Sequence, residues 1–265
     1  MTETTGNNHN CCPRPLLEVC TGDPEGLEEA LRGGADRVEL CSGLAEGGLT
    51  PSVAMIRYAS KRLPTNVLIR PRAGDFVYTT AELSVMAEDI DEAVKAGASG
   101  VVIGALTPDG HVDTLACRML LDHAPGLENT FHRAFDVTAD PEKALEEIIS
   151  LGFARVLTSG CSPSALEGTG TIRRLHRQAA GRIKILAGAG VNPSNAAEIL
   201  RRSEADELHA SARTLRKSAM AHEGNISMGT ADTAGDSRPA TDSTTVAAIR
   251  KAIEIFQNDQ LNKPE

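Results

Sequence analysis

Aromatic residues are scarce in this 265-residue chain: Phe, Tyr and Trp together make up 3%, and Trp is absent. Proteins that bind single-stranded nucleic acid stack its bases on aromatic side chains, so a stacking platform is excluded. Basic residues are in deficit too, with 27 Lys and Arg against 36 Asp and Glu, a formal net charge of −9. Since that balance disfavours polyanions, we expect neither nucleic acid nor an anionic membrane as a partner.

Long apolar runs are missing as well. No stretch approaches the ~18 apolar residues of a membrane-spanning helix, and the polar N-terminal MTETTGNNHNCCPRP lacks the apolar core of a secretory signal. Six cysteines are scattered along the chain: Cys11, Cys12, Cys20, Cys41, Cys117 and Cys161. This usage favours free thiols or a metal over a disulfide framework, and we expect a cytoplasmic protein.

Short apolar segments alternate with amphipathic ones along the whole chain. The apolar segments are Leu16–Cys20, Arg37–Cys41, Val67–Pro71, Gly100–Ala105, Thr130–Phe135, Arg155–Ser159, Ile183–Ala187 and Glu207–Ser211. Strands that alternate with helices predict βαβ units and a parallel sheet. Eight such units in ~250 residues predict an α/β protein with a single (β/α)8 TIM-like barrel, closed by a last helix over Val246–Phe256.

The predicted barrel domain covers residues 15–258, between a disordered tail over residues 1–14 and a short tail over 259–265. Residues 213–245, rich in Ser, Thr, Gly and Ala, interrupt the alternation just before the last helix. Their composition predicts a flexible insert. The alternative is a lid, because the segment leaves the C-terminal end of a strand.

Two neighbouring strands carry the same Glu-x-Cys pattern, in LEVC and VELC. Side chains alternate along a strand, so Glu18, Cys20, Glu39 and Cys41 should all point into the barrel. Adjacent strands lie ~4.8 Å apart, which can bring the sulfurs of Cys20 and Cys41 close together. Two thiolates suit a soft ion such as Cu(I). The alternative is that both cysteines are small buried apolar residues.

The inward carboxylates Glu18 and Glu39 should repel one another unless a cation, a proton or an arginine lies between them. Arg70 and Arg72 share one parity in IRPR and can supply that charge. A structural ion-pair cluster and a catalytic site both remain open, since burying such a cluster costs desolvation.

Two histidines, His132 in TFHRAFD and His209 in ELHAS, also have inward parity near strand ends. In a barrel of this type the chemistry lies at the C-terminal ends of the strands. Together with the carboxylates they predict an acid–base constellation. The candidate catalytic residues are therefore Glu18, Glu39, Arg70, His132 and His209.

The ends of the seventh and eighth predicted strands are rich in small residues. Barrels often bind phosphate on these loops, where backbone N–H groups approach an anion. We therefore predict an anion site at Gly188, Gly190 and Ser211, with Arg72. Cys161, after the sixth strand, could add a third thiol.

The chain also contains the motifs LEVC, GGADRVELCSGLAEGGLTPS, IRPRAGDFVY, TFHRAFD, LGFARVLTSG, GRIKILAGAGV and ELHASAR. These motifs carry a resemblance: from Leu16 to Met228 the chain resembles the CutC copper homeostasis family. LTSGC and the SMG near Ser227 look more like animal members than bacterial ones. The resemblance implies a TIM-like barrel, a homo-oligomer (dimer or tetramer), and a cytoplasmic location that in some members includes the nucleus. It also implies Cu(I) binding, attributed in animal members to two cysteines that match Cys20 and Cys41.

Two functions of different classes follow. The first is a cytosolic Cu(I)-binding protein of copper homeostasis, with Cys20 and Cys41 as ligands. The alternative is an enzyme that acts on a small phosphorylated or carboxylated substrate by acid–base chemistry. A scaffold that works through its oligomer surface ranks behind both, because polar side chains kept inside a barrel are costly without a use.

Overall fold

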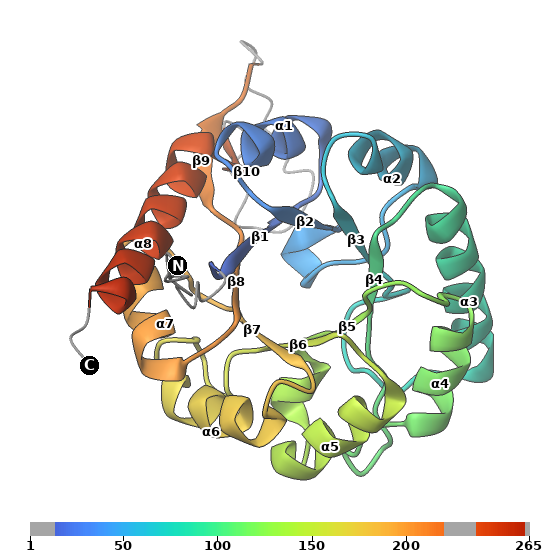
Figure 1. The fold of residues 1–265 in the computed structure, drawn as a ribbon. Helices are drawn as coiled ribbons and strands as arrows, with labels where there is room; N and C mark the ends of the chain where they lie inside the picture. The colour runs from blue at the N-terminus through green and yellow to red at the C-terminus, as the bar shows by residue number, and fades with distance from the viewer. Residues whose placement is uncertain (1–13, 220–236, 263–265) are drawn as a thin grey trace, which may run out of the picture.

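Eight parallel strands close into a barrel surrounded by a ring of helices (Figure 1). The computed structural model describes residues 14–219 and 237–262. The strands are β1 (Leu16–Thr21), β2 (Arg37–Leu40), β3 (Thr65–Leu68), β4 (Gly100–Ile103), β5 (Thr130–Phe131), β6 (Arg155–Thr158), β7 (Lys184–Ala187) and β8 (Glu207–Ala210). Each pairs with the next, and β8 pairs with β1. The predicted TIM-like barrel is confirmed.

The outer ring consists of α1 (Pro24–Arg32), α2 (Val53–Ser60), α3 (Thr80–Lys95), α4 (Thr114–Asp122), α5 (Pro141–Leu151), α6 (Thr169–Ala179), α7 (Ala196–Ser203) and α8 (Ser243–Leu261). Their starts follow from the local sequence. At the start of α1, Asp23 precedes Pro24 and accepts a hydrogen bond from the Gly26 N–H. At the start of α3, Thr79 and Glu82 form a capping box. No helix in the described part of the chain is long and apolar enough to cross a membrane.

The main core lies between the strands and the helices and is almost entirely aliphatic. Leu17, Val19, Val38 and Leu40 are completely buried there. The alternate residues of β1 and β2 therefore face the barrel interior, as the period of a strand requires. This packing explains how the chain builds a large core with so few aromatic residues.

Two strands, β3 and β5, end three or more residues before the predicted segments do. β3 ends at Leu68, and Arg70 instead exchanges backbone and hydroxyl hydrogen bonds with Thr50. β5 ends at Phe131, because His132 caps the 3-10 helix η2 (Arg133–Val137) by accepting a hydrogen bond from Ala134 N–H. Residues beyond these points belong to loops at the barrel mouth, where strand parity no longer sets side-chain direction.

The segment predicted as a flexible insert, 213–245, has regular structure at both ends. β9 (Arg213–Lys217) pairs antiparallel with β10 (Ser237–Thr241), and α8 begins at Ser243 after its cap Asp242. The Asp242 N–H donates to the Ala212 carbonyl, which closes the base of this ribbon. Residues 220–236 lie outside the described chain, as do 1–13 of the predicted N-terminal tail and 263–265 of the C-terminal one. α8 itself runs on to Leu261, beyond the predicted domain boundary.

Candidate functional site

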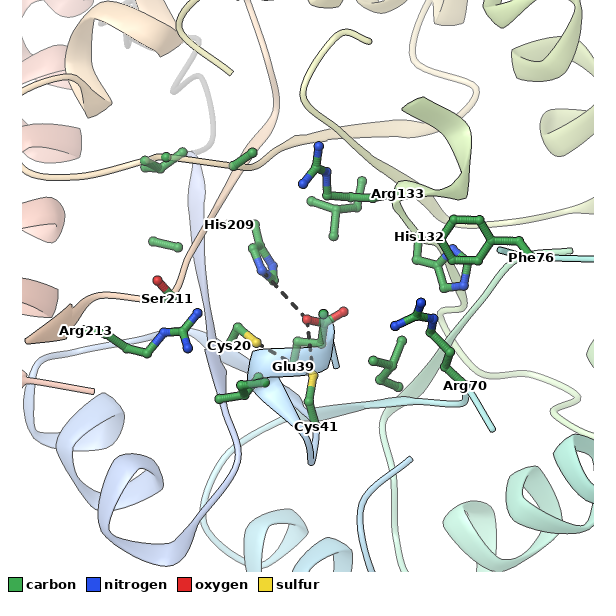
Figure 2. Close-up of a pocket in the computed structure, with 18 residues that line it drawn as sticks. Cys20, Glu39, Cys41, Arg70, Phe76, His132, Arg133, His209, Ser211 and Arg213 are labelled. Atoms are coloured by element: carbon green, nitrogen blue, oxygen red, sulfur yellow. Dashed lines mark hydrogen bonds and ion pairs between the residues drawn. The ribbon is translucent and has the colours of Figure 1, made fainter. Parts of the chain in front are cut away.

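A cavity of about 310 Å³ opens at the C-terminal ends of the strands. Figure 2 shows thiols, a carboxyl group and an imidazole on one side of this cavity, and an arginine, a second imidazole and a phenyl ring on the other. The lining includes Cys20, Glu39, Cys41, Leu44, Leu68, Arg70, Phe76, His132, Arg133, Leu157, Gly190, Val191, His209, Ser211 and Arg213. This is where a TIM barrel positions its ligand chemistry.

The sulfurs of Cys20 and Cys41 lie 3.6 Å apart. The register of β1 and β2 pairs Cys20 with Glu39. Cys41 follows directly after the end of β2, at the mouth of the barrel. Both side chains are buried, at 8% and 1% exposure. The predicted approach of the two thiols is therefore present.

Further donor atoms surround the sulfurs. The Glu39 Oε2 atom lies 3.5 Å from the Cys41 Sγ and 3.7 Å from the His209 Nε2. One ligand atom from each of Cys20, Glu39 and His209 lies within 4.8 Å of the others. Sulfur, carboxylate oxygen and imidazole nitrogen thus converge on one point, so Cys20, Glu39 and His209 can hold a metal ion, and the Cys41 sulfur lies beside them.

The two thiols differ in their ionisation. A hydrogen bond from the Cys41 thiol, together with the nearby His209, holds the pKa of Cys20 well below its ordinary value despite burial. The same hydrogen bond and burial raise the pKa of Cys41 well above its ordinary value. Burial and the charge on Cys20 raise the pKa of Glu39 to about 8. The hydrogen bond between the two sulfurs therefore favours ionisation of one thiol of the pair over the other.

Glu18 holds His209 in place from below. It is completely buried, and its Oε1 atom lies 2.8 Å from the His209 Nδ1. Burial opposes ionisation, but Arg37 and His209 keep the pKa of Glu18 well below its ordinary value. Burial also opposes protonation of His209, yet the carboxyls of Glu39 and Glu18 raise its pKa well above the ordinary value. Since Glu18 does not line the cavity, it acts through His209 rather than on a ligand.

The group between the inward carboxylates Glu18 and Glu39 is His209. The arginine on Glu18 is Arg37, which the sequence analysis missed. Its Nε lies 2.5 Å from the Glu18 Oε2, and it also pairs with Glu207. Asn66 donates a further hydrogen bond to Glu18. The missed signal is parity, because Arg37 precedes Glu39 by two residues on β2 and must share its face.

The prediction that Arg70 and Arg72 would neutralise these carboxylates is wrong. Because β3 ends before them, Arg70 turns to the loops and donates to the carbonyls of Glu46, Gly48 and Gly74. It still lines the cavity. Arg72 pairs with Asp75 and Glu82 and does not line the cavity.

His132 lines the cavity opposite the thiols, as Figure 2 shows. It is 5% exposed, and its ring centre lies 4.9 Å from that of Phe76. Burial and the charge of Arg70 lower the pKa of His132 to about 3. His132 is therefore a neutral imidazole at physiological pH.

The residues of the predicted anion site separate into two groups. Gly190 and Ser211 line the cavity, and Arg213 joins them from the start of β9. Gly188 does not line the cavity. Its lack of a side chain lets the backbone pack against Leu157, because a Cβ at this position would lie 2.6 Å from the Leu157 Cδ1 atom. Cys161 is also absent from the lining, because its backbone N–H is held by Asp136 outside the mouth.

Comparison with known proteins bears on both fold and family. Residues 15–214 match the model of the CutC family. The chain is 48% identical over 247 residues to the human copper homeostasis protein cutC homolog, covering 91% of this chain and 90% of the human one. It is 45% identical over 240 residues to a CutC family protein of Histophilus somni, covering 90% of this chain and 99% of that protein.

A solved structure gives the same answer. The CutC copper homeostasis protein of Streptococcus agalactiae superimposes with a TM-score of 0.72 at 36% identity, covering 74% of this chain and 98% of that one. The agreement of the family model, the relatives and the fold confirms the resemblance found in the motifs. The chain belongs to the CutC family of copper homeostasis proteins.

Proposed function

We propose that this protein binds Cu(I) at the barrel mouth through the sulfurs of Cys20 and Cys41. The observation that carries the proposal is the 3.6 Å separation of two buried sulfurs facing an open cavity. Soft thiolate ligands select Cu(I) over hard cations. The family name of the relatives, copper homeostasis, agrees with this chemistry.

The neighbours of the thiols suit such a site. A thiol must lose its proton before it binds a metal, so Cu(I) binding displaces the proton of the Cys41 thiol, whose sulfur lies 3.5 Å from the Glu39 carboxyl group. His209, on the other side of Glu39, supports the negative charge of Cys20. We place this activity in the cytoplasm, where reducing conditions keep both thiols free, and in a dimer or tetramer as the family implies.

Titration of the purified protein with Cu(I) under anaerobic, reducing conditions, against a chromophoric Cu(I) chelator, tests the proposal. The expected result is saturation near one ion per subunit. A double Cys20→Ser, Cys41→Ser variant should lose this binding, while Cys117→Ser and Cys161→Ser should retain it because neither thiol lines the cavity. Equal binding by the double variant would contradict the proposal.

A second candidate function is acid–base catalysis on a small anionic substrate. The observation that favours it is the imidazole of His209, held between two carboxyls while it faces a cavity lined by Arg70, Arg133 and Arg213. Such a group can transfer protons. Thermal-shift screening with phosphorylated and carboxylated metabolites tests it, since a ligand that binds the native state raises its stability. Stabilisation by Cu(I) alone would count against the enzyme.

A further inference from the structure

The side of the cavity away from the thiols holds two buried N–H groups that lack hydrogen-bond partners in the described part of the protein. They are the Nε of Arg70 and the Nε2 of His132. The tautomer of His132 follows from its contacts. Its Nδ1 accepts a hydrogen bond from the Ala134 N–H, so in the neutral ring the hydrogen is on Nε2. Neither atom has a partner within hydrogen-bond distance among the residues that the structure describes, although the buried Tyr78 hydroxyl lies near the Arg70 side chain.

Arg70 also carries a buried positive charge without a carboxylate partner among the described residues. Arg70 is only 6% exposed, and its Nη1 and Nη2 atoms donate hydrogen bonds to backbone carbonyls. A buried charge is costly unless it is paired. The protein has an excess of carboxylates, with a net charge of −9. Arg70 nevertheless has none of them as a partner among the described residues. The natural partner is an anion that enters the cavity.

Phe76 lies against both donor side chains. Its ring centre is 4.9 Å from that of His132 and 5.3 Å from the Arg70 guanidinium carbon. Further apolar lining comes from Leu44, Leu68, Leu157 and Val191. Apolar walls disfavour a strongly hydrated tetrahedral anion and favour a flat anionic group attached to an apolar body. Phe76 is on the partly exposed loop between β3 and α3, so this wall of the cavity lies at its open side.

We propose that the cavity binds a small organic acid, whose carboxylate accepts hydrogen bonds from Arg70 Nε and His132 Nε2 while its apolar body lies toward Leu44 and Leu68, the apolar wall that packs against the thiols. The inference rests on the second candidate function, namely that the cavity accepts an anion, and is independent of copper binding. Both donors are already shielded from water, so the carboxylate gains their hydrogen bonds without stripping water from them.

Isothermal titration calorimetry at constant ionic strength, with isovalerate, acetate and inorganic phosphate as probes, tests the site. The expected order of affinity is isovalerate, then acetate, then phosphate. His132→Asn keeps an acceptor for the Ala134 N–H but removes the donor in the cavity. We expect it to raise the Kd of isovalerate about ten- to hundredfold, the worth of a buried hydrogen bond to a charged group. Arg70→Met should do the same.

The matched control is Arg72→Met, two residues along the same loop and outside the cavity, which should leave the Kd unchanged. Since Arg70 also ties loop carbonyls, Arg70→Lys, which keeps the charge without Nε, carries the test if Arg70→Met fails to fold. The double Cys20→Ser, Cys41→Ser variant should still bind isovalerate, so failure of the copper proposal stays separate from failure of this one. Tighter binding of phosphate than of isovalerate, an unchanged Kd in His132→Asn, or no saturable binding of either carboxylate would overturn the proposal.

Discussion

The Nδ1 atom of His209 lies 2.8 Å from the Glu18 Oε1, so a fully buried carboxylate on β1 orients the imidazole on β8 at the seam where the barrel closes. Arg37 holds the other oxygen of the same carboxylate. The site at the mouth therefore rests on an ionic layer below it.

Replacing Glu18 by Gln should destabilise the protein by about 3 kcal/mol. Removing one partner of a buried ion pair leaves the other charge uncompensated, here on Arg37 and His209. Urea denaturation at pH 7 measures the loss. Glu92→Gln, which breaks an exposed pair with Lys95, is the control and should be nearly neutral. A similar, small effect of both substitutions would show that the ionic layer contributes little.

Protonation of His132 should make the protein less stable in acid. Its pKa is about 3 in the folded protein against an ordinary 6.5, so between these values the unfolded chain binds the extra proton. The free energy of unfolding should then fall as pH drops below 6.5, by up to about 1.4 kcal/mol per pH unit from this group. Above pH 6.5 the group should have no effect on the pH dependence.

Urea denaturation of the wild type and of His132→Asn between pH 4 and pH 7 isolates that contribution. The free energy of unfolding of the wild type should approach that of His132→Asn as the pH falls below 6.5, because only the wild type carries this imidazole. Parallel profiles across the whole range would refute the assignment.

A methyl group at position 104 should disturb His132 without touching the thiols. A Cβ on Gly104 would lie 2.7 Å from both Cε1 and Nδ1 of the His132 ring. Overpacking of this kind costs about 1–3 kcal/mol. We expect Gly104→Ala to weaken isovalerate binding and to leave the Cu(I) stoichiometry intact, as measured by calorimetry and chelator competition. Loss of Cu(I) binding in a folded Gly104→Ala protein would show that the two halves of the cavity are not independent.

Asp136 organises the loop after β6, and its removal should be costly. Its carboxylate accepts hydrogen bonds from Thr158 Oγ1 and from the backbone N–H groups of Ser159 and Cys161, and pairs with Arg133. Asp136→Ala leaves several of these donors unsatisfied, so we expect a loss of about 2–4 kcal/mol in thermal or urea unfolding. An exposed carboxylate such as Asp75 provides the comparison, with a much smaller expected loss.

The inward residues of β1 and β2 could be predicted because a strand has a fixed period of two and neighbouring strands are in register. The approach of Cys20 to Cys41 followed from that rule, and so did the inward direction of Glu39 and His209. Arg37 was accessible to the same rule. Arg70 and Arg72 were not, because their parity was counted along a strand that ends at Leu68.

The conformation of the loops at the mouth is set by side-chain hydrogen bonds and not by the two-residue period of a strand. The contact between Phe76 and His132 depends on how the loop after β3 folds over η2, and no local pattern encodes that. The ribbon formed by β9 and β10 escaped prediction for a related reason: its sequence is polar and lacks the alternation that marks a half-buried strand.

β1 is held by neighbours from both ends of the chain. It pairs with β2 on one edge and β8 on the other, and Asp36, which accepts the Leu17 N–H, is bound in turn by Arg250 of α8. Cys20 and Cys41 come early in the chain, but the second edge of β1 is covered only by β8, and Asp36 is bound from α8. The geometry that brings the two sulfurs together thus depends on late segments, and a chain cut before β8 would carry both cysteines without the strand that closes the barrel beside them.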